Sequence, residues 1–252
     1  MGVKRKKTTR KNIGNKSKYY SKARQWYSVN GSIRVPGFRR VKFVNYRDCV
    51  NITTSKGRIK VLKYKNGYAD IRLEKPLYAF EAQDGKVLLV TKNRYKAGDS
   101  QKLAINAYVV VPAGKAYAPK PLATAKASIS KRYKIAYFSD FRWLTDMKKD
   151  VKLALAPEWL KGRGFGLFLD SLRHVELARL GVRKWFASIL NTPQSKAFAE
   201  LRGFRKPTRV EAELLVNCVF GEKIQDKEKY VEIVQSDYVI KDISPIKRRQ
   251  KK

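Results

Sequence analysis

The spacing of hydrophobic and polar residues changes character partway along the chain. From about residue 33 to residue 111, apolar and polar side chains mostly alternate with a period of two, which is typical of β-strands with one buried face. The segments that show this alternation are 40–44, 58–62 and 69–73. The more continuously apolar segments 86–91 and 103–111 predict strands covered on both faces. We expect about five to seven strands in this region.

Turn signals separate the expected strands. A glycine lies at each of several boundaries, and Asn-Gly and Asp-Gly are pairs that two-residue hairpin turns favour. The dipeptides at these boundaries are Asn30-Gly31, Lys56-Gly57, Asn66-Gly67, Asp84-Gly85 and Ala97-Gly98. The Asn66-Gly67 pair lies between two alternating stretches and is the strongest hairpin signal in the chain.

The second half of the chain has a helical period. Apolar residues between Phe165 and Leu190 recur every three or four positions, which predicts one long helix that Asp170 or Ser171 caps and Pro193 ends. Thr208 and Glu211 have the spacing of a capping box and predict a helix from Thr208 to Phe220. Shorter helices are predicted at Phe141–Ala154 and Pro193–Leu201, and alternation predicts a late strand at Tyr230–Ile240.

These patterns predict an α+β protein. The strand-rich N-terminal half is expected to form an antiparallel sheet or small barrel, and the C-terminal half to be helix-rich with a late closing strand. Pro112, Pro119 and Pro121 indicate an extended, exposed connector between the two halves. The expected organisation is a basic disordered arm at 1–18, a strand-rich region at 19–111, a connector at 112–131, a helical region at 132–245 and a basic tail at 246–252.

Charge is the most unusual property of the sequence. Its 252 residues include 57 Lys plus Arg and 21 Asp plus Glu, a formal net charge of +36. The first 47 residues contain fifteen Lys or Arg and no carboxylate before Asp48. A small soluble domain needs a net charge of only roughly 2–8 in magnitude. Since self-repulsion on this scale opposes compaction, a polyanionic partner is expected, and nucleic acid supplies one through counterion release.

Membrane and extracellular interpretations are less favoured. No apolar run approaches the roughly 18 residues of a spanning helix, so no membrane insertion is expected. Cys49 and Cys218 are isolated, which points to an intracellular, reducing compartment rather than a disulfide framework. That compartment is the cytoplasm, or an organelle if the basic N-terminus is a targeting segment.

The sequence contains few groups for catalysis. His174 is the one histidine, so an imidazole-based metal site or relay has little support, and we expect no catalytic residue, no metal and no cofactor. A magnesium-dependent nuclease remains an alternative because several carboxylates lie close in sequence. These sets are Asp70 with Glu74, Glu81 with Asp84, Asp140 with Asp146 and Asp150, and Glu222 with Asp226 and Glu228. The glycine-rich loop Gly162–Gly166 is open to two interpretations, a backbone contact to phosphate or a plain hinge.

Basic residues interleave with aromatic ones, as expected of a protein that holds phosphates and stacks unpaired bases. On the expected long helix, basic residues would form a side opposite the apolar stripe. The residues expected to contact nucleic acid are Lys4, Arg5, Lys6, Lys7, Arg10, Lys11, Lys18, Tyr19, Tyr20, Lys22, Arg24, Arg39, Arg40, Lys131, Arg132, Tyr133, Arg163, Arg173, Arg179, Arg183, Lys184, Lys247, Arg248 and Arg249.

One short string carries a family resemblance. Gly67-Tyr68-Ala69-Asp70 resembles the start of the G-Y-x-D-x-G motif of Oblin-1, the protein family of the viroid-like RNA elements called Obelisks, and Arg72 stands where that motif has its last Gly. The resemblance covers four positions. It implies a role beside the element's own RNA and assigns no catalytic residue.

Together these features predict a nucleic-acid-binding protein that prefers RNA to DNA and recognises mainly the phosphate backbone. A role in RNA packaging or scaffolding, in a viral, mobile-element or other ribonucleoprotein assembly or oligomer, fits this chemistry. The alternatives are a viral capsid or nucleoprotein, an organelle ribosomal protein, or the magnesium-dependent nuclease.

Overall fold

The computed structural model describes residues 37–63, 74–97, 100–113, 115–144, 157–160, 164–188, 199–200, 202–221 and 224–244. Within them, eleven strands form one sheet whose main path runs β1-β5-β6-β7-β8-β4-β3-β2. The strands of this path are β1 (Phe38–Val41), β2 (Phe43–Asn45), β3 (Cys49–Thr54), β4 (Gly57–Leu62), β5 (Glu74–Ala82), β6 (Val87–Ala97), β7 (Ser100–Ala113) and β8 (Ala116–Ser130). The expected mixed α+β class is confirmed.

The sheet branches at its longest strand, β8. The first part of β8 pairs in parallel with β4, through Val61 and Tyr117, whereas the part from Ala123 onward pairs antiparallel with β9 (Ile135–Trp143). The sheet continues from β9 to β10 (Lys184–Ser188) and β11 (Tyr238–Asp242). It is open, so the alternative of a small barrel is wrong.

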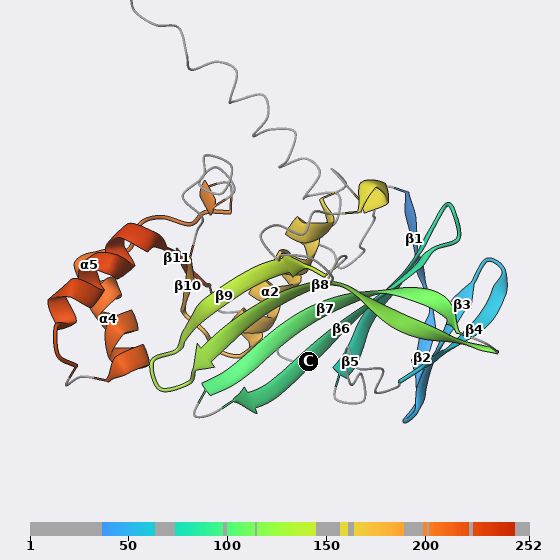
Figure 1. The fold of residues 1–252 in the computed structure, drawn as a ribbon, viewed down its shortest axis with the longest axis horizontal. Coiled ribbons are helices and arrows are strands. Elements are labelled where there is room, and N and C mark those ends of the chain that lie inside the picture. Colours follow the sequence, from blue (N-terminus) through green and yellow to red (C-terminus); the bar gives the residue numbers. More distant parts are fainter. Residues whose placement is uncertain are drawn as a thin grey trace, which may run out of the picture.

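Three α-helices are described, and they cover opposite faces of the sheet. Helix α2 (Phe165–Arg179) packs on one face, where Phe168, Leu169 and Leu172 share the largest core with residues of β6, β7 and β8. Helices α4 (Arg209–Phe220) and α5 (Lys227–Asp237) cover the other face at β9–β11. Figure 1 shows α2 behind the sheet and α4 and α5 at its left end. A short 3-10 helix, η2 (Glu158–Leu160), precedes α2.

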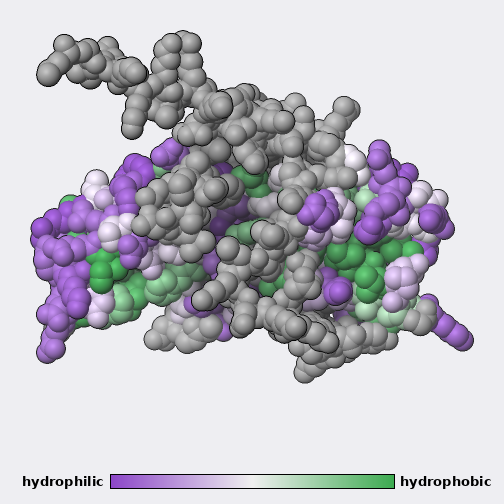
Figure 2. Space-filling model, turned by 45° about the horizontal axis from the view of Figure 1, so that its top comes forward, coloured by the Kyte–Doolittle hydropathy of each residue, from purple (hydrophilic) through white to green (hydrophobic). Residues whose placement is uncertain are grey.

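A second core lies at the other end of the sheet, where the β3–β4 hairpin packs against β6 and β7. Strand β7 contributes to both cores by simple alternation: Ile105 and Ala107 face α2, whereas Tyr108 and Val110 face the hairpin. Strand β8 instead has an irregularity, because its extra residue Leu122 interrupts the pairing with β7. Hydrophilic side chains gather at the two outer ends of the described surface, and hydrophobic ones show between them (Figure 2).

Several local predictions are confirmed. Strands occur at the alternating segments 40–44 and 58–62 and at the apolar segments 86–91 and 103–111, and turns occur at Lys56-Gly57 and Asp84-Gly85. The helix expected over Thr208–Phe220 forms, with Glu211 N–H donating to the Thr208 hydroxyl and Thr208 N–H donating to the Glu211 carboxylate at 2.9 Å.

Other predictions are wrong. The stretch expected as an exposed connector, 112–131, contains the end of β7 and all of β8, with a core-facing row of buried residues at Ala123, Ala125 and Ala127. The helix expected over Phe165–Leu190 ends at Arg179, and Lys184–Ser188 is strand β10. The expected strand at Tyr230–Ile240 is mostly helix α5, and only its last residues begin β11. The first residues of the helix expected over Phe141–Ala154 instead belong to strand β9, which ends at Trp143.

The remaining local predictions lie largely outside the described residues. These are the arm at 1–18, the tail at 246–252, the strand at 69–73, the Asn66-Gly67 hairpin and most of the helix over Pro193–Leu201. None of the described helices is long and apolar enough to cross a membrane.

Candidate nucleic-acid interface

One end of the sheet collects basic and aromatic side chains from four separate parts of the chain. Strand β6 ends beside the start of β7, and Gln101 near that start pairs with Ile129, so the end of β6 lies near the β8–β9 turn (Figure 1, lower left). Arg183 N–H donates to the Lys134 carbonyl at 2.7 Å, which brings the segment after α2 to the same turn. We call this surface the basic end. Its members are Arg94, Tyr95 and Lys96 of β6, Lys131, Arg132, Tyr133 and Lys134 of the turn, Arg179 of α2, and Arg183.

The cations of the basic end are exposed. This holds for Arg94, Lys96, Lys131, Arg132, Lys134, Arg179 and Arg183, and Tyr95 is 40% exposed. The Arg132 guanidinium lies over the Tyr133 ring, with its Cζ atom 5.2 Å from the ring centroid, close enough for a cation–π contact. Lys131, Lys134 and Arg183 form no ion pair with any described residue. These three cations therefore present positive charge that no ion pair with a described residue offsets.

A single buried carboxylate organises one side of the basic end. Glu176 of α2 is 2% exposed, and its carboxylate contacts Lys92 Nζ at 2.5 Å, Arg179 Nη1 at 2.5 Å and Arg94 Nη2 at 3.5 Å. Burial opposes ionisation of Glu176, but the hydrogen bonds from Lys92 and Arg179 outweigh it and hold the pKa of this carboxyl below its ordinary value. Three cations share one negative charge, so the group stays net positive.

Two residues expected on a basic helix face have internal partners. Arg173 is buried: it donates to the backbone carbonyls of Lys126 at 2.7 Å and Asp140 at 2.6 Å and pairs with Asp170. Burial lowers the pKa of Arg173 to about 9. Lys184 lies on strand β10 and contacts Glu211 at 2.7 Å and Asp242 at 3.0 Å. Neither cation is free on a helix face, so we do not include Arg173 or Lys184 in the candidate interface.

The other expected contacts are dispersed or undescribed. Arg39 and Arg40 lie on β1, where Arg39 binds Glu81 at 2.6 Å and Arg40 covers the Tyr78 ring. The structure does not bring them to the basic end. The residues outside the described part are Lys4, Arg5, Lys6, Lys7, Arg10, Lys11, Lys18, Tyr19, Tyr20, Lys22, Arg24, Arg163, Lys247, Arg248 and Arg249. The Gly67–Asp70 string also lies outside it.

Four members of the basic end are not predicted from the sequence: Arg94, Tyr95, Lys96 and Lys134. The first three stand in Lys92-Asn93-Arg94-Tyr95-Lys96, a basic and aromatic run at the end of a strand. That run is the available signal, because its composition resembles that of Lys131-Arg132-Tyr133. What the run does not reveal is that the two segments are neighbours.

The carboxylates do not form a recognisable metal centre in the described part of the chain, where no group of three or more His, Cys, Asp or Glu residues could hold a metal ion. Glu81 accepts hydrogen bonds from Arg39 and Ser55, Asp84 pairs with Lys86, and Glu228 pairs with Arg209. Other members of the candidate sets lie outside the described residues, namely Asp70, Asp146, Asp150 and Glu222.

Residues 164–166 of the glycine-rich loop are described, and the first of them is Gly164. It precedes α2 with a φ of 76°, a left-handed conformation. Glycine adopts this conformation without steric cost, which accounts for its place at the start of the helix.

Comparison of the chain with protein-family models, with curated proteins and with solved structures finds no match.

Proposed function

We propose that the chain binds RNA, mainly through the phosphate backbone, and that the basic end is its principal contact surface within the described residues. The observation that carries the proposal is the gathering of Lys131, Lys134 and Arg183, three exposed cations that have no ion pair among the described residues, at the same end of the sheet as the exposed ring of Tyr95. Each lysine or arginine that contacts a phosphate releases condensed counterions. An exposed tyrosine at the same end of the sheet offers a face for an unpaired base.

The net charge of +36 supports the same proposal. Several of the few acidic residues pair with Lys or Arg inside the fold, so they do not offset the positive charge at the surface. Glu81, Asp170, Glu176 and Glu211 are all buried and all pair with Lys or Arg. A polyanion would neutralise the cationic surplus that remains outside. RNA is preferred to DNA in this proposal because basic residues interleaved with tyrosines suit single strands.

The test is filter binding of a single-stranded RNA over a salt series, with two triple variants of equal charge. Lys131→Gln, Lys134→Gln and Arg183→Gln remove three cations from the basic end, whereas Lys60→Gln, Lys115→Gln and Lys229→Gln remove three exposed lysines from elsewhere. We expect the first variant to reduce the salt slope by about 2, since each phosphate contact on a single strand contributes about 0.7. The control should reduce it less. Absent or salt-insensitive binding would overturn the proposal, and equal losses in both variants would overturn the assignment to the basic end.

Packaging or scaffolding of RNA is the role we propose for this binding. A scaffolding protein forms defined assemblies of protein and RNA. Size-exclusion chromatography with light scattering, with and without RNA, measures this directly. Complexes with more than one chain per RNA support the role, and a strictly one-to-one complex at all ratios contradicts it.

A further inference from the structure

Lys63 is a buried lysine that forms no ion pair with any described residue. It follows β4, is 5% exposed, and its Nζ donates to the Tyr46 carbonyl at 2.7 Å. Its backbone N–H donates to the Asp48 carbonyl at 3.0 Å, which fixes the residue against the β2–β3 turn. Lysines are almost never this buried unless paired, and an ammonium carries three donors, of which a single carbonyl satisfies one.

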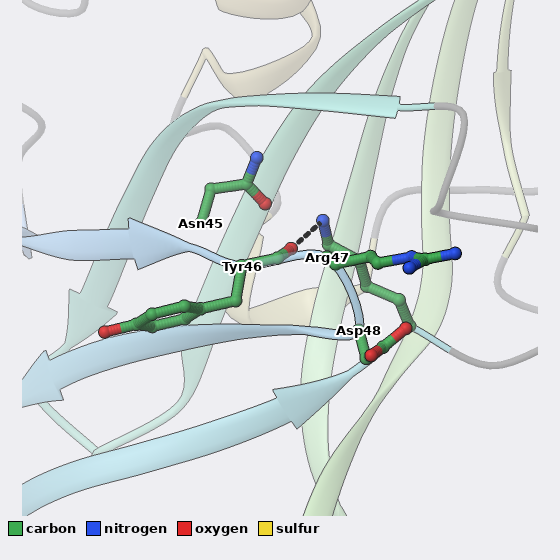
Figure 3. A pocket seen from close by; sticks show the side chains of 5 residues that line it. Asn45, Tyr46, Arg47 and Asp48 are labelled. Atoms are coloured by element: carbon green, nitrogen blue, oxygen red, sulfur yellow. Dashed lines mark hydrogen bonds between the residues drawn. The ribbon is translucent and has the colours of Figure 1, made fainter.

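A hollow opens at this ammonium. It measures about 720 Å³ and is lined by Asn45, Tyr46, Arg47, Asp48 and Lys63. The turn is closed by Tyr46 N–H donating to the Cys49 carbonyl at 2.9 Å. Figure 3 shows the side chains of Arg47 and Asp48 directed to one side of the turn and the Tyr46 ring directed to the other. Arg47 is exposed, so it can turn toward a ligand held at Lys63.

From this geometry we propose that the hollow binds a phosphate group, with the Lys63 ammonium and the Arg47 guanidinium as its two cationic contacts. The ligand supplies the negative charge that Lys63 lacks, and a charge-assisted hydrogen bond is roughly twice as strong as a neutral one. Asn45 adds an amide that can donate to a phosphate oxygen. The inference rests on the proposed function in one respect, which is that an RNA phosphate is the source of the group.

The position of the hollow makes it separate from the basic end. It lies at the β2–β3 turn, which joins the two outermost strands at one end of the main path, whereas the basic end lies at the β8–β9 turn (Figure 1). A strand of RNA that reached both sites would run along the sheet. Loss of one site therefore need not remove the other.

Asp48 provides a control of opposite sign. Its exposed carboxylate lines the same hollow, so it repels an incoming phosphate. Removing that charge strengthens binding if the ligand is an anion. It has no such effect if the hollow takes a neutral or cationic ligand.

The experiment is isothermal titration of the full chain with inorganic phosphate, a phosphomonoester (uridine monophosphate) and a phosphodiester (a dinucleotide). We expect Lys63→Met to weaken phosphate binding by about tenfold or more, the loss of one charged hydrogen bond. Arg47→Ala should weaken it less, and Asp48→Asn should strengthen it. Lys60→Met removes the same charge from an exposed position on β4 and should leave the affinity unchanged. Binding of the dinucleotide assigns the site to the RNA backbone, and binding of the monoester alone assigns it to a terminal phosphate.

Two results would overturn the inference: no binding of any of the three probes, or equal affinity in the Lys63→Met and Lys60→Met proteins. If Lys63→Met does not fold, as circular dichroism would show, Arg47→Ala and Asp48→Asn carry the test, because both residues are exposed. Failure here is distinguishable from failure of the proposed function. The latter is read from RNA binding by the basic-end variant, in which Lys63 is intact.

Discussion

The Nζ atom of Lys92 lies 2.5 Å from the carboxylate of Glu176, and this contact ties helix α2 to strand β6 beneath the basic end. Both side chains are largely buried, with exposed fractions of 14% and 2%. Arg94 and Arg179 bind the same carboxylate from the surface side. Glu176 therefore has two effects: it stabilises the packing of α2, and it neutralises part of the charge that would otherwise face a ligand.

Glu176→Gln should change stability and RNA affinity in opposite directions. We expect the free energy of unfolding to fall by about 2 kcal/mol, because a buried cation is left without its charged partner. That cation is Lys92, for which Glu176 is the counter-charge among the described residues. RNA affinity should rise, since Arg94 and Arg179 are no longer neutralised. Urea unfolding and filter binding measure the two quantities.

The matched control for this change is Glu213→Gln, which removes a surface partner of Arg209. Surface ion pairs contribute little, so this control should shift stability by no more than about 0.5 kcal/mol. A fall in RNA affinity with Glu176→Gln would contradict the assignment of Arg94 and Arg179 to the interface.

Tyr95→Ala should weaken binding to single-stranded RNA by about 1–3 kcal/mol, the cost of one lost base stack, and leave binding to duplex RNA nearly unchanged. The reason is that the Tyr95 ring is 40% exposed and can stack with an unpaired base, whereas duplex bases are not available to it. Tyr95→Phe keeps the ring and should bind like the parent protein. Fluorescence anisotropy with matched single-stranded and duplex RNAs measures the difference. Equal losses on both RNAs would show that Tyr95 does not stack with bases.

Local sequence patterns predict the elements whose hydrogen bonds join residues close together in the sequence. The capping box of α4 spans four residues, and the β3–β4 and β5–β6 hairpins turn at Gly57 and Gly85. In each case neighbouring residues satisfy the backbone groups, so the signal is contained in a short window. The α+β class follows from the sum of such windows.

Where strands pair with partners far away in sequence, the predictions of secondary structure from local patterns are wrong. Val182 and Phe186 continue the spacing of α2, but Gly181 adopts a φ of 77° and ends the helix, and β10 then inserts between β9 and β11. By local rules the prolines of β8 favour an exposed connector. Strand β4 pairs with β8 at Tyr117, and β9 pairs with β8 only from Ala123 onward. Between these two positions no described strand occupies that edge of β8, so Pro119 and Pro121 are tolerated there.

The candidate interface shows the same limit. The basic and aromatic composition of the sequence predicts several members of this interface, and the structure places them at one end of the sheet. These residues are Lys131, Arg132, Tyr133, Arg179 and Arg183. Composition does not separate them from Arg173, which is the same residue type on the same helix as Arg179. Only the packing of α2 on β8 and β9 decides that Arg173 is buried while Arg179 is exposed.

Acid should unfold the protein partly through Glu211. Hydrogen bonds from Arg205, at 2.7 Å to each carboxylate oxygen, and from Lys184 hold the pKa of Glu211 well below its ordinary value of 4.5, against the opposing effect of burial. Since the pKa is lower in the folded state, this contribution is fully present above pH 4.5 and is lost as the pH falls through the folded-state value. Urea unfolding of Glu211→Gln should show less dependence on pH below about 4.5 than the parent protein. Glu232→Gln, an exposed change on α5, is the control and should keep the parental dependence.

The titration of His174 can be followed by proton NMR without overlap, because this residue is the one histidine in the chain and contributes a single imidazole Hε1 signal. Burial, and then the charge of Lys241, lower its pKa from 6.5 to about 4. The ring lies edge-on to Trp185, with centroids 6.1 Å apart. We therefore expect the imidazole signal to titrate with a midpoint near 4 in the folded protein.

The same shift predicts a pH dependence of stability. Because the unfolded chain binds this proton at higher pH, stability should fall as the pH drops from about 6.5 toward 4. Lys241→Met removes the neighbouring charge and should move the midpoint of His174 upward, while Lys229→Met, on α5, should leave it in place. A midpoint near 6.5 in the parent protein would show that His174 is solvated rather than packed against Trp185.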